Sequence, residues 1–139
     1  MIDGELVTRK VVLIGGALEE LRKLAAGGLD AYLADPYKEI LAERFLERMV
    51  SRMIDINYHV ITGSDHPPPK DYYDSFTELG RMGVLDTKFA AGIAVAAGLR
   101  NRIVHEYDEI DPEKVFEAIL SALADLPVYM KGVLSFRDR

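Results

Sequence analysis

Five residues with side chains suited to phosphate chemistry lie within eight consecutive positions: Arg100, Asn101, Arg102, His105 and Tyr107. Arginine stays charged and offers planar, paired donors to phosphate oxygens, so it can stabilise negative charge that develops at phosphorus. Histidine titrates near neutral pH and can accept the proton of a ribose 2′-hydroxyl or donate one to a leaving oxygen. Asn101 could orient the imidazole, and Tyr107 could donate a hydrogen bond or stack on a base. The residue types therefore suit cleavage of an RNA phosphodiester, a reaction that needs no metal ion.

The spacing of these residues leaves more than one interpretation open. Cations near the C-terminus of a helix also interact favourably with the helix dipole, so the cluster could be a helix end and nothing more. On an ideal helix, Arg100 and His105 differ by about 140° in direction and by about 7.5 Å along the axis. One helix would present both to one phosphate only if the arginine wrapped round or the helix end bent. A two-fold axis beside the helix would instead bring Arg100 and His105 of two subunits into one cleft.

Composition limits the possible classes of protein. The chain has 139 residues, which suits a single domain over residues 1–139, and it has no cysteine, which excludes disulfides and thiolate metal sites. Its formal net charge of −6 argues against a protein that coats nucleic acid through its overall field, so RNA binding must rest on a local basic cluster. We expect neither a secretion signal nor a membrane-spanning segment, and thus a cytoplasmic protein.

The apolar residues follow helical spacing almost throughout, which predicts an all-α bundle of about five helices. The expected helices cover residues 7 to about 26, 36–62, 72–82, 87–105 and 112 to about 130. Asp35-Pro36 and Asp111-Pro112 are typical helix starts, with Asp as N-cap and Pro at the first helical position. Asp86 is a further expected N-cap, and Pro127 should bend the last helix.

The fourth expected helix contains "KFAAGIAVAAGL", in which no residue after the lysine is polar. Alanine and glycine occur on every side, as in a helix that is buried all round. Such a helix would lie at the centre of the bundle or against a second subunit, and a core helix of a monomer is the alternative. A position against a second subunit would place the helix near a homodimer interface and connect it to the polar cluster at its end.

Other charged residues have simpler explanations. His59 and His66 do not have the spacing of a metal site, so no metal is predicted. Four residues of the second helix alternate in charge at helical spacing, which is typical of a solvated face: Glu43, Arg44, Glu47 and Arg48.

The segment "RNRIVHEYDEID" resembles the signature of the HEPN superfamily in its HepT-like branch. That signature is an arginine, a polar residue, three further positions, a histidine, one residue and a tyrosine, here at Arg100, Asn101, His105 and Tyr107. The similarity extends over about residues 36–131 and includes "AERFLERMVSRMIDINYHVI", "DYYDSFTELGRMGVL" and "DPEKVFEAI". The resemblance implies a HEPN-like helical fold for the single domain and a homodimer with its active site at the interface.

The resemblance also implies a function. It implies a metal-independent endoribonuclease that uses no cofactor, with Arg100 and His105 as catalytic residues and with Asn101, Arg102 and Tyr107 supporting RNA binding. Such a protein is the toxin of a type II- or VII-like toxin–antitoxin pair. Its usual partner is a minimal nucleotidyltransferase antitoxin, which can attach AMP to the motif tyrosine, here Tyr107. The alternative function is a non-catalytic subunit of the same fold that binds substrate for the nucleotidyltransferase or regulates it.

Overall fold

The computed structural model describes residues 1–95, 98 and 111–139, and this part of the chain contains six helices and no strand. The helices are α1 (Gly4–Ala25), α2 (Gly28–Ala34), α3 (Pro36–Gly63), α4 (Tyr72–Arg81), α5 (Thr87–Ile93) and α7 (Pro112–Arg137). The expected all-α class is confirmed. The bounds of α3 and α4 agree with the expected helices to within one residue.

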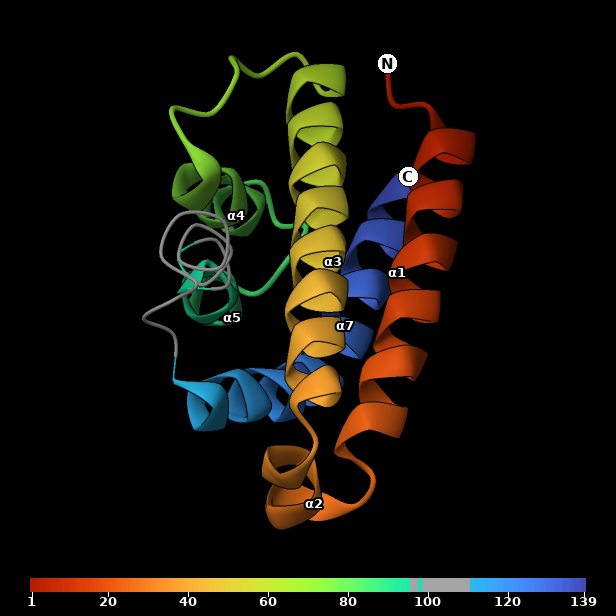
Figure 1. The fold of residues 1–139 in the computed structure, drawn as a ribbon. Helices are drawn as coiled ribbons and strands as arrows, with labels where there is room; N and C mark the ends of the chain where they lie inside the picture. Colours follow the sequence, from red (N-terminus) through yellow and green to blue (C-terminus); the bar gives the residue numbers. More distant parts are fainter. Residues whose placement is uncertain (96–97, 99–110) are drawn as a thin grey trace.

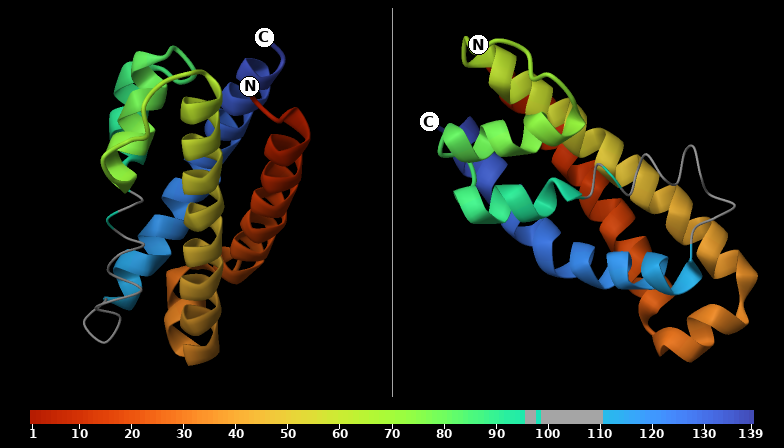
Figure 2. Two further views of the ribbon diagram at one scale, coloured as in Figure 1. Left: turned by 90° about the horizontal axis from the view of Figure 1, so that it is seen from above. Right: turned by 90° about the vertical axis from the view of Figure 1, so that its left-hand side faces the viewer.

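Three long helices, α1, α3 and α7, pack together and form the body of the molecule (Figures 1 and 2). The short helix α2 closes one end, and α4 and α5 lie beside α3 on the side away from α1. Each long helix contributes aliphatic side chains that are almost completely buried: Ile14 and Leu21 from α1, Leu46, Met53, Ile56 and Val60 from α3, and Ile119, Leu126 and Val133 from α7.

An aspartate caps the N-terminus of five of the six described helices. In each case the side chain accepts a hydrogen bond from a backbone N–H of the first turn, and the residues are Asp3, Asp35, Asp71, Asp86 and Asp111. These caps satisfy donors that have no partner within the helix, which sets where each helix begins. The caps expected at Asp35, Asp86 and Asp111 are confirmed.

The sequence did not predict α2. Gly27-Gly28 was interpreted only as the end of the first helix, and Gly28 does adopt a positive φ of +87°. A new helix of seven residues begins there and buries Tyr32, whose ring lies 5.1 Å from that of Phe116. Such a short helix shows too little of the helical period to be recognised from its pattern, and it is held by this contact with α7.

The expected fourth helix is only partly described. α5 ends at Ile93, although Ala94 keeps right-handed helical dihedrals (φ −57°, ψ −25°), and the part expected to reach His105 falls largely outside the described residues. The buried side chains at this helix are Ala90, Ile93 and Ala94, whereas Ala91, Gly92 and Val95 are exposed. The described part of the helix is therefore not enclosed on every side by its own chain, and the rest of the expected helix lies largely outside the described residues. Its exposed face carries Lys88 as well as Ala91, Gly92 and Val95, so it is apolar except for this lysine.

The last helix, α7, continues through Pro127 without interruption. Its axis changes direction along its length, as expected for a helix that contains a proline (Figures 1 and 2). α7 is long and apolar enough to meet the length and hydropathy criteria for a membrane span. Val115, Ile119 and Val133 are completely buried inside the bundle, so one face of α7 packs into the core.

Candidate functional site

The five residues of the expected site, Arg100, Asn101, Arg102, His105 and Tyr107, lie outside the described residues. Their mutual geometry therefore stays a prediction. The structure does describe what holds the chain on either side of them. These anchoring contacts determine where the segment leaves the bundle and where it returns.

On the N-terminal side, two glycines let α5 pack closely on its neighbours. A Cβ at Gly80 would lie 3.0 Å from the Cβ of Ala90, so α4 and α5 approach more closely than a larger residue would permit. A Cβ at Gly132 would lie 2.7 Å from Cδ2 of Leu85 and 2.9 Å from the carbonyl oxygen of Val84. The turn between α4 and α5 thus sits directly on the backbone of α7. This packing fixes the start of the segment that leads to the motif.

On the C-terminal side, the chain re-enters the bundle at the start of α7. Asp111 accepts a hydrogen bond of 2.9 Å from the backbone N–H of Glu113, and Pro112 occupies the first helical position. One turn later Phe116 packs its ring against Tyr32 of α2. Both ends of the motif segment are therefore held by buried or capped structure.

An apolar cavity of about 150 Å³ lies between α3, α5 and α7, next to the start of the motif segment. Its described lining comes from α3 (Leu46, Met49, Val50), from α5 and the residues after it (Ile93, Val95) and from α7 (Ala118, Ser121, Ala122, Asp125, Leu126). Val95 is 67% exposed, so the mouth of the cavity adjoins the open face of α5. The lining is suited to an apolar side chain and offers few groups for binding phosphate.

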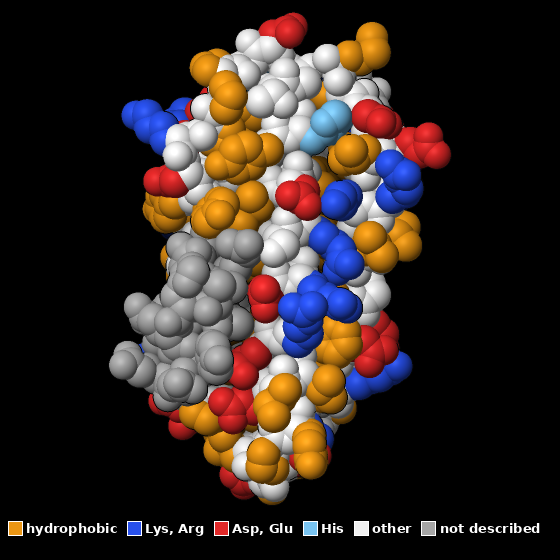
Figure 3. All heavy atoms as spheres, turned by 45° about the horizontal axis from the view of Figure 1, so that its top comes forward, with side chains coloured by type: hydrophobic (Ala, Val, Ile, Leu, Met, Phe, Trp, Pro, Cys, Tyr) orange, Lys and Arg blue, Asp and Glu red, His pale blue; other side chains and the backbone are white. Residues whose placement is uncertain are grey.

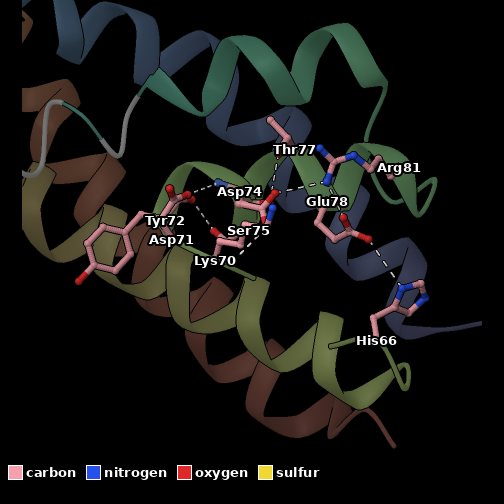
Figure 4. Close-up of polar contacts among 9 residues, drawn as sticks. All are labelled: His66, Lys70, Asp71, Tyr72, Asp74, Ser75, Thr77, Glu78 and Arg81. Carbon is pink, nitrogen blue, oxygen red and sulfur yellow. Dashed lines mark hydrogen bonds and ion pairs between the residues drawn. The ribbon is translucent and has the colours of Figure 1, made fainter. Parts of the chain in front are cut away.

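The densest polar cluster among the described residues lies elsewhere, at α4 (Figure 4). The Arg81 guanidinium lies 2.6 Å from a carboxylate oxygen of Glu78 and 3.3 Å from one of Asp74. The backbone N–H of Lys70 donates a 3.0 Å hydrogen bond to Asp74, and His66 Nδ1 lies 3.7 Å from Glu78. The Lys70 amide first, and then Arg81, hold the pKa of Asp74 below its usual value. These groups satisfy one another and fasten the proline-containing loop before α4, so the cluster is structural.

The remaining histidine also has a structural role. His59 Nε2 accepts a 2.7 Å hydrogen bond from the backbone N–H of Asp3, which ties the end of α3 to the start of α1. In residues 1–95, 98 and 111–139, no group of three or more histidine, aspartate or glutamate side chains is arranged to hold a metal ion.

A buried polar network was not foreseen from the sequence. Tyr129 Oη lies 2.6 Å from Asn57 Oδ1, and Asn57 Nδ2 donates to Ser75 Oγ across 3.1 Å. The network joins α7, α3 and α4, and it therefore supports the α4–α5 unit that precedes the motif. Tyr129 has the spacing of a core residue, but nothing local in the sequence identifies Asn57 or Ser75 as its partners.

Comparisons with known proteins place the chain in a family. A family model described as ribonuclease HepT-like matches residues 14–133, which include all five motif residues. The tRNA nuclease HepT of Aphanizomenon flos-aquae is 36% identical over 135 residues, covering 97% of this chain and 92% of that protein. A putative RNase of Archaeoglobus fulgidus is 31% identical over a shorter stretch of 64 residues, 46% of this chain and 48% of that protein.

Solved structures share the fold. The tri-AMPylated HEPN toxin of Shewanella oneidensis, solved in complex with its MNT antitoxin, superposes with a TM-score of 0.86 at 21% identity, covering 97% of this chain and 99% of that one. A toxin–antitoxin structure with AMP-PNP gives a TM-score of 0.83 at 21% identity, covering 96% and 99%. At such identities these structures establish the HEPN toxin fold, and the family model and the curated relative establish the family. This chain belongs to the ribonuclease HepT-like family.

Proposed function

We propose that the protein is a metal-independent endoribonuclease, the toxin of a type II- or VII-like toxin–antitoxin pair. The observation that carries the proposal is the intact motif, from Arg100 through His105 to Tyr107, inside the part of the chain that matches the family model. The curated relative named a tRNA nuclease covers nearly the whole chain, which makes tRNA the first RNA to test. A protein of this kind acts in the cytoplasm, where its RNA substrates are.

The proposed reaction is transesterification within the RNA strand. His105 accepts the proton of a ribose 2′-hydroxyl, the 2′-oxygen attacks the adjacent phosphorus, and the bond to the 5′-oxygen of the next nucleotide breaks. That oxygen leaves with a proton, which an imidazolium can supply. Arg100 stabilises the additional negative charge on the phosphoryl oxygens, while Asn101, Arg102 and Tyr107 support binding. The products carry a 2′,3′-cyclic phosphate and a 5′-hydroxyl.

We propose further that the active protein is a homodimer that shares its site across a two-fold axis. The open apolar face of α5, formed by Ala91, Gly92 and Val95, supports this arrangement. Ala91 has a small side chain and Gly92 has none, which permits the close approach of a second helix, and burial of Val95 is favourable. A pair of chains packed here would bring their motif segments together, so each subunit could contribute Arg100 and His105 to a common cleft.

The proposed partner is a minimal nucleotidyltransferase antitoxin that adenylylates Tyr107. The solved structures with this fold include toxins in complex with an antitoxin, one of them tri-AMPylated, which supports the proposal. AMP on Tyr107 would place a bulky anion two residues from His105. It would occupy the site for the RNA phosphate and repel the RNA backbone.

Induced expression of this chain alone tests the function against the non-catalytic alternative. A nuclease should arrest growth, and the arrest should disappear in His105→Ala while the amount of soluble protein stays the same. A binding or regulatory subunit should have the same effect on growth with or without His105. Equal growth of the two strains, with degraded RNA in neither, would therefore contradict the proposed nuclease activity.

A further inference from the structure

A nuclease with a net charge of −6 has to bind a polyanion against its own overall field, so its cations must be concentrated locally. Figure 3 shows such a concentration: lysine and arginine side chains form a column over the face where α1 and α3 meet. The residues of this basic stripe are Lys10 of α1 and Arg44, Arg48 and Arg52 of α3.

The stripe follows from helical spacing and from one contact between helices. The three arginines are four residues apart, so they share one face of α3 and are separated by about 6 Å along its axis at each step. Lys10 Nζ lies 3.1 Å from Asp55 Oδ2, one turn beyond Arg52, which extends the stripe onto α1.

Two of the four cations have no carboxylate partner among the residues that the structure describes. Lys10 pairs with Asp55, and Arg44 lies 3.7 Å from Glu47. Within the described residues, Arg48 and Arg52 form no hydrogen bond or ion pair, and Arg48 is exposed. Arg44 and Arg48 are exposed and Glu43 and Glu47 partly exposed, as expected for a solvated face, but Arg44 and Glu47 are the only two of these four that form an ion pair among the described residues. The guanidinium groups of the exposed Arg48 and the partly exposed Arg52 are thus not engaged by any described residue and can bind an external anion.

We propose that this stripe binds the phosphate backbone of the RNA substrate, with Arg48 and Arg52 as the principal contacts. The proposal rests on the proposed function, since it assumes that RNA is the substrate. Guanidinium groups bind phosphate oxygens through paired donors, and such contacts position an RNA without reading its sequence. The stripe is thus a binding site additional to the motif and is not part of the catalytic machinery.

The stripe lies on the opposite side of α3 from the apolar cavity. Arg48 is separated by about 160° around the helix from Leu46 and from Val50, both of which line that cavity. A helix with its side chains is only about 10–12 Å wide, so a folded RNA can contact both of its sides. The stripe would then bind the body of a structured RNA while another part of the same RNA occupies the cleavage site.

The acidic residues of α3 beside the basic stripe are Glu43 and Glu47. They repel an RNA strand less than their charges in the sequence suggest. Glu47 is engaged with Arg44, and burial together with Glu39 raises the pKa of Glu43. The pairing of Glu47 with Arg44 reduces the repulsion that an RNA strand would meet beside the arginines. The balance of charge on this face therefore favours a polyanion, and an RNA is the polyanion that the proposed activity requires.

The test measures RNA binding as a function of salt. Unfractionated tRNA is titrated with the full-length protein carrying His105→Ala, which prevents cleavage, and with the same protein carrying also Arg48→Ala and Arg52→Ala. The two substitutions should weaken binding about tenfold or more at low salt and should lower the slope of log Kd against log salt by roughly 1.5, the contribution of two phosphate contacts. Circular dichroism checks that the fold is retained.

Two control variants make the result specific. Arg48→Lys with Arg52→Lys keeps both charges and should preserve most of the salt slope, although affinity falls because the planar donors are lost. Lys131→Ala removes an exposed cation from α7 that also lacks a partner among the described residues, and it should leave both affinity and slope nearly unchanged.

Three results would overturn the proposal. An unchanged affinity and slope in the double alanine variant, while wild-type protein cleaves the same RNA, would refute the stripe and leave the proposed function intact. Unchanged RNA binding with loss of binding to a co-expressed nucleotidyltransferase would assign the stripe to that protein. A failure of the parent protein to bind RNA, together with a failure of wild type to cleave it, would refute the stripe and the proposed function together.

Discussion

Tyr129 Oη of α7 lies 2.6 Å from Asn57 Oδ1 of α3, and it is also 3.1 Å from the carbonyl oxygen of Met53. Burial raises the pKa of Tyr129 well above its usual value, so the phenol keeps its proton and donates it to these oxygens. Asn57 Nδ2 in turn donates a hydrogen bond to Ser75 Oγ of α4. One chain of buried hydrogen bonds thus links the body of the bundle to the unit that carries α5.

Tyr129→Phe should therefore destabilise the protein. It leaves the buried Oδ1 of Asn57 without its donor, which costs about 1–3 kcal/mol of the free energy of unfolding. Tyr37→Phe is the matched control, because Tyr37 is 76% exposed and its change should stay within about 0.5 kcal/mol. Urea unfolding of both variants measures the difference. Equal free energies of unfolding for Tyr129→Phe and Tyr37→Phe would show that the hydrogen bonds of Tyr129 contribute nothing to stability.

The glycines of the helices should respond to alanine in opposite directions. At Gly132 an added Cβ would meet Leu85 and the backbone of Val84, so Gly132→Ala should destabilise by about 1–3 kcal/mol. At Gly15, inside α1, the Cβ would meet nothing within 4 Å, so Gly15→Ala should stabilise by about 0.5–1 kcal/mol. Thermal and urea unfolding measure the sign of the change in the free energy of unfolding for each variant. Stabilisation at both positions would disprove the close contact between the α4–α5 turn and α7.

The proposed dimer is tested on the exposed face of α5. Ala91→Arg places a charge on the apolar surface without entering the core, so it should yield a folded monomer that has lost nuclease activity. Ala94→Arg, by contrast, would insert its charge where the side chain is completely buried in its own subunit, and it should unfold the chain. Light scattering with circular dichroism separates the two outcomes. A monomeric wild type at micromolar concentration, or a fully active Ala91→Arg monomer, would contradict the shared site.

Control by the antitoxin is tested at Tyr107. Co-expression with a minimal nucleotidyltransferase should add one or more adenylyl groups, which peptide mass spectrometry should locate in "IVHEYDEIDPEK". Tyr107→Phe should escape this modification, so any toxicity that it retains should resist adenylylation. If the active transferase silences the Phe variant as well as wild type, the antitoxin acts by binding or at another residue.

Helix starts and the helical class were predictable because their signals are local. Asp35-Pro36 and Asp111-Pro112 each satisfy the backbone donors of their own first turn, so the sequence alone reveals them. The contact of Gly132 with Val84 and Leu85 joins residues far apart in the chain, and no local pattern predicts it. The same holds for the partners of Asn57. That Arg48 and Arg52 have no partner among the described residues could not be predicted either, because it depends on side-chain positions that helical spacing does not determine.

In the candidate site, too, some features could be predicted from local sequence and others could not. The types and spacing of Arg100, His105 and Tyr107, together with the similar helices around them, were enough to identify the family that the comparisons confirm, while the chemistry assigned to these residues stays a prediction. In the proposed dimer their arrangement would depend on how the two chains meet and on where the segment lies between Val95 and Asp111, and local sequence determines neither. The open face of α5 bears on both, because it is the surface proposed for the dimer and it directly precedes the motif segment.

The most direct measurement incubates purified protein with tRNA in the presence of EDTA and determines the end groups of the products. The account predicts cleavage that EDTA does not reduce, with a 2′,3′-cyclic phosphate on one fragment and a 5′-hydroxyl on the other. His105→Ala should lower the rate by about 10²–10⁴-fold, the usual contribution of a general acid or base, and Arg100→Lys should also fall well below wild type. Products with 5′-phosphates, or activity that EDTA abolishes, would contradict it.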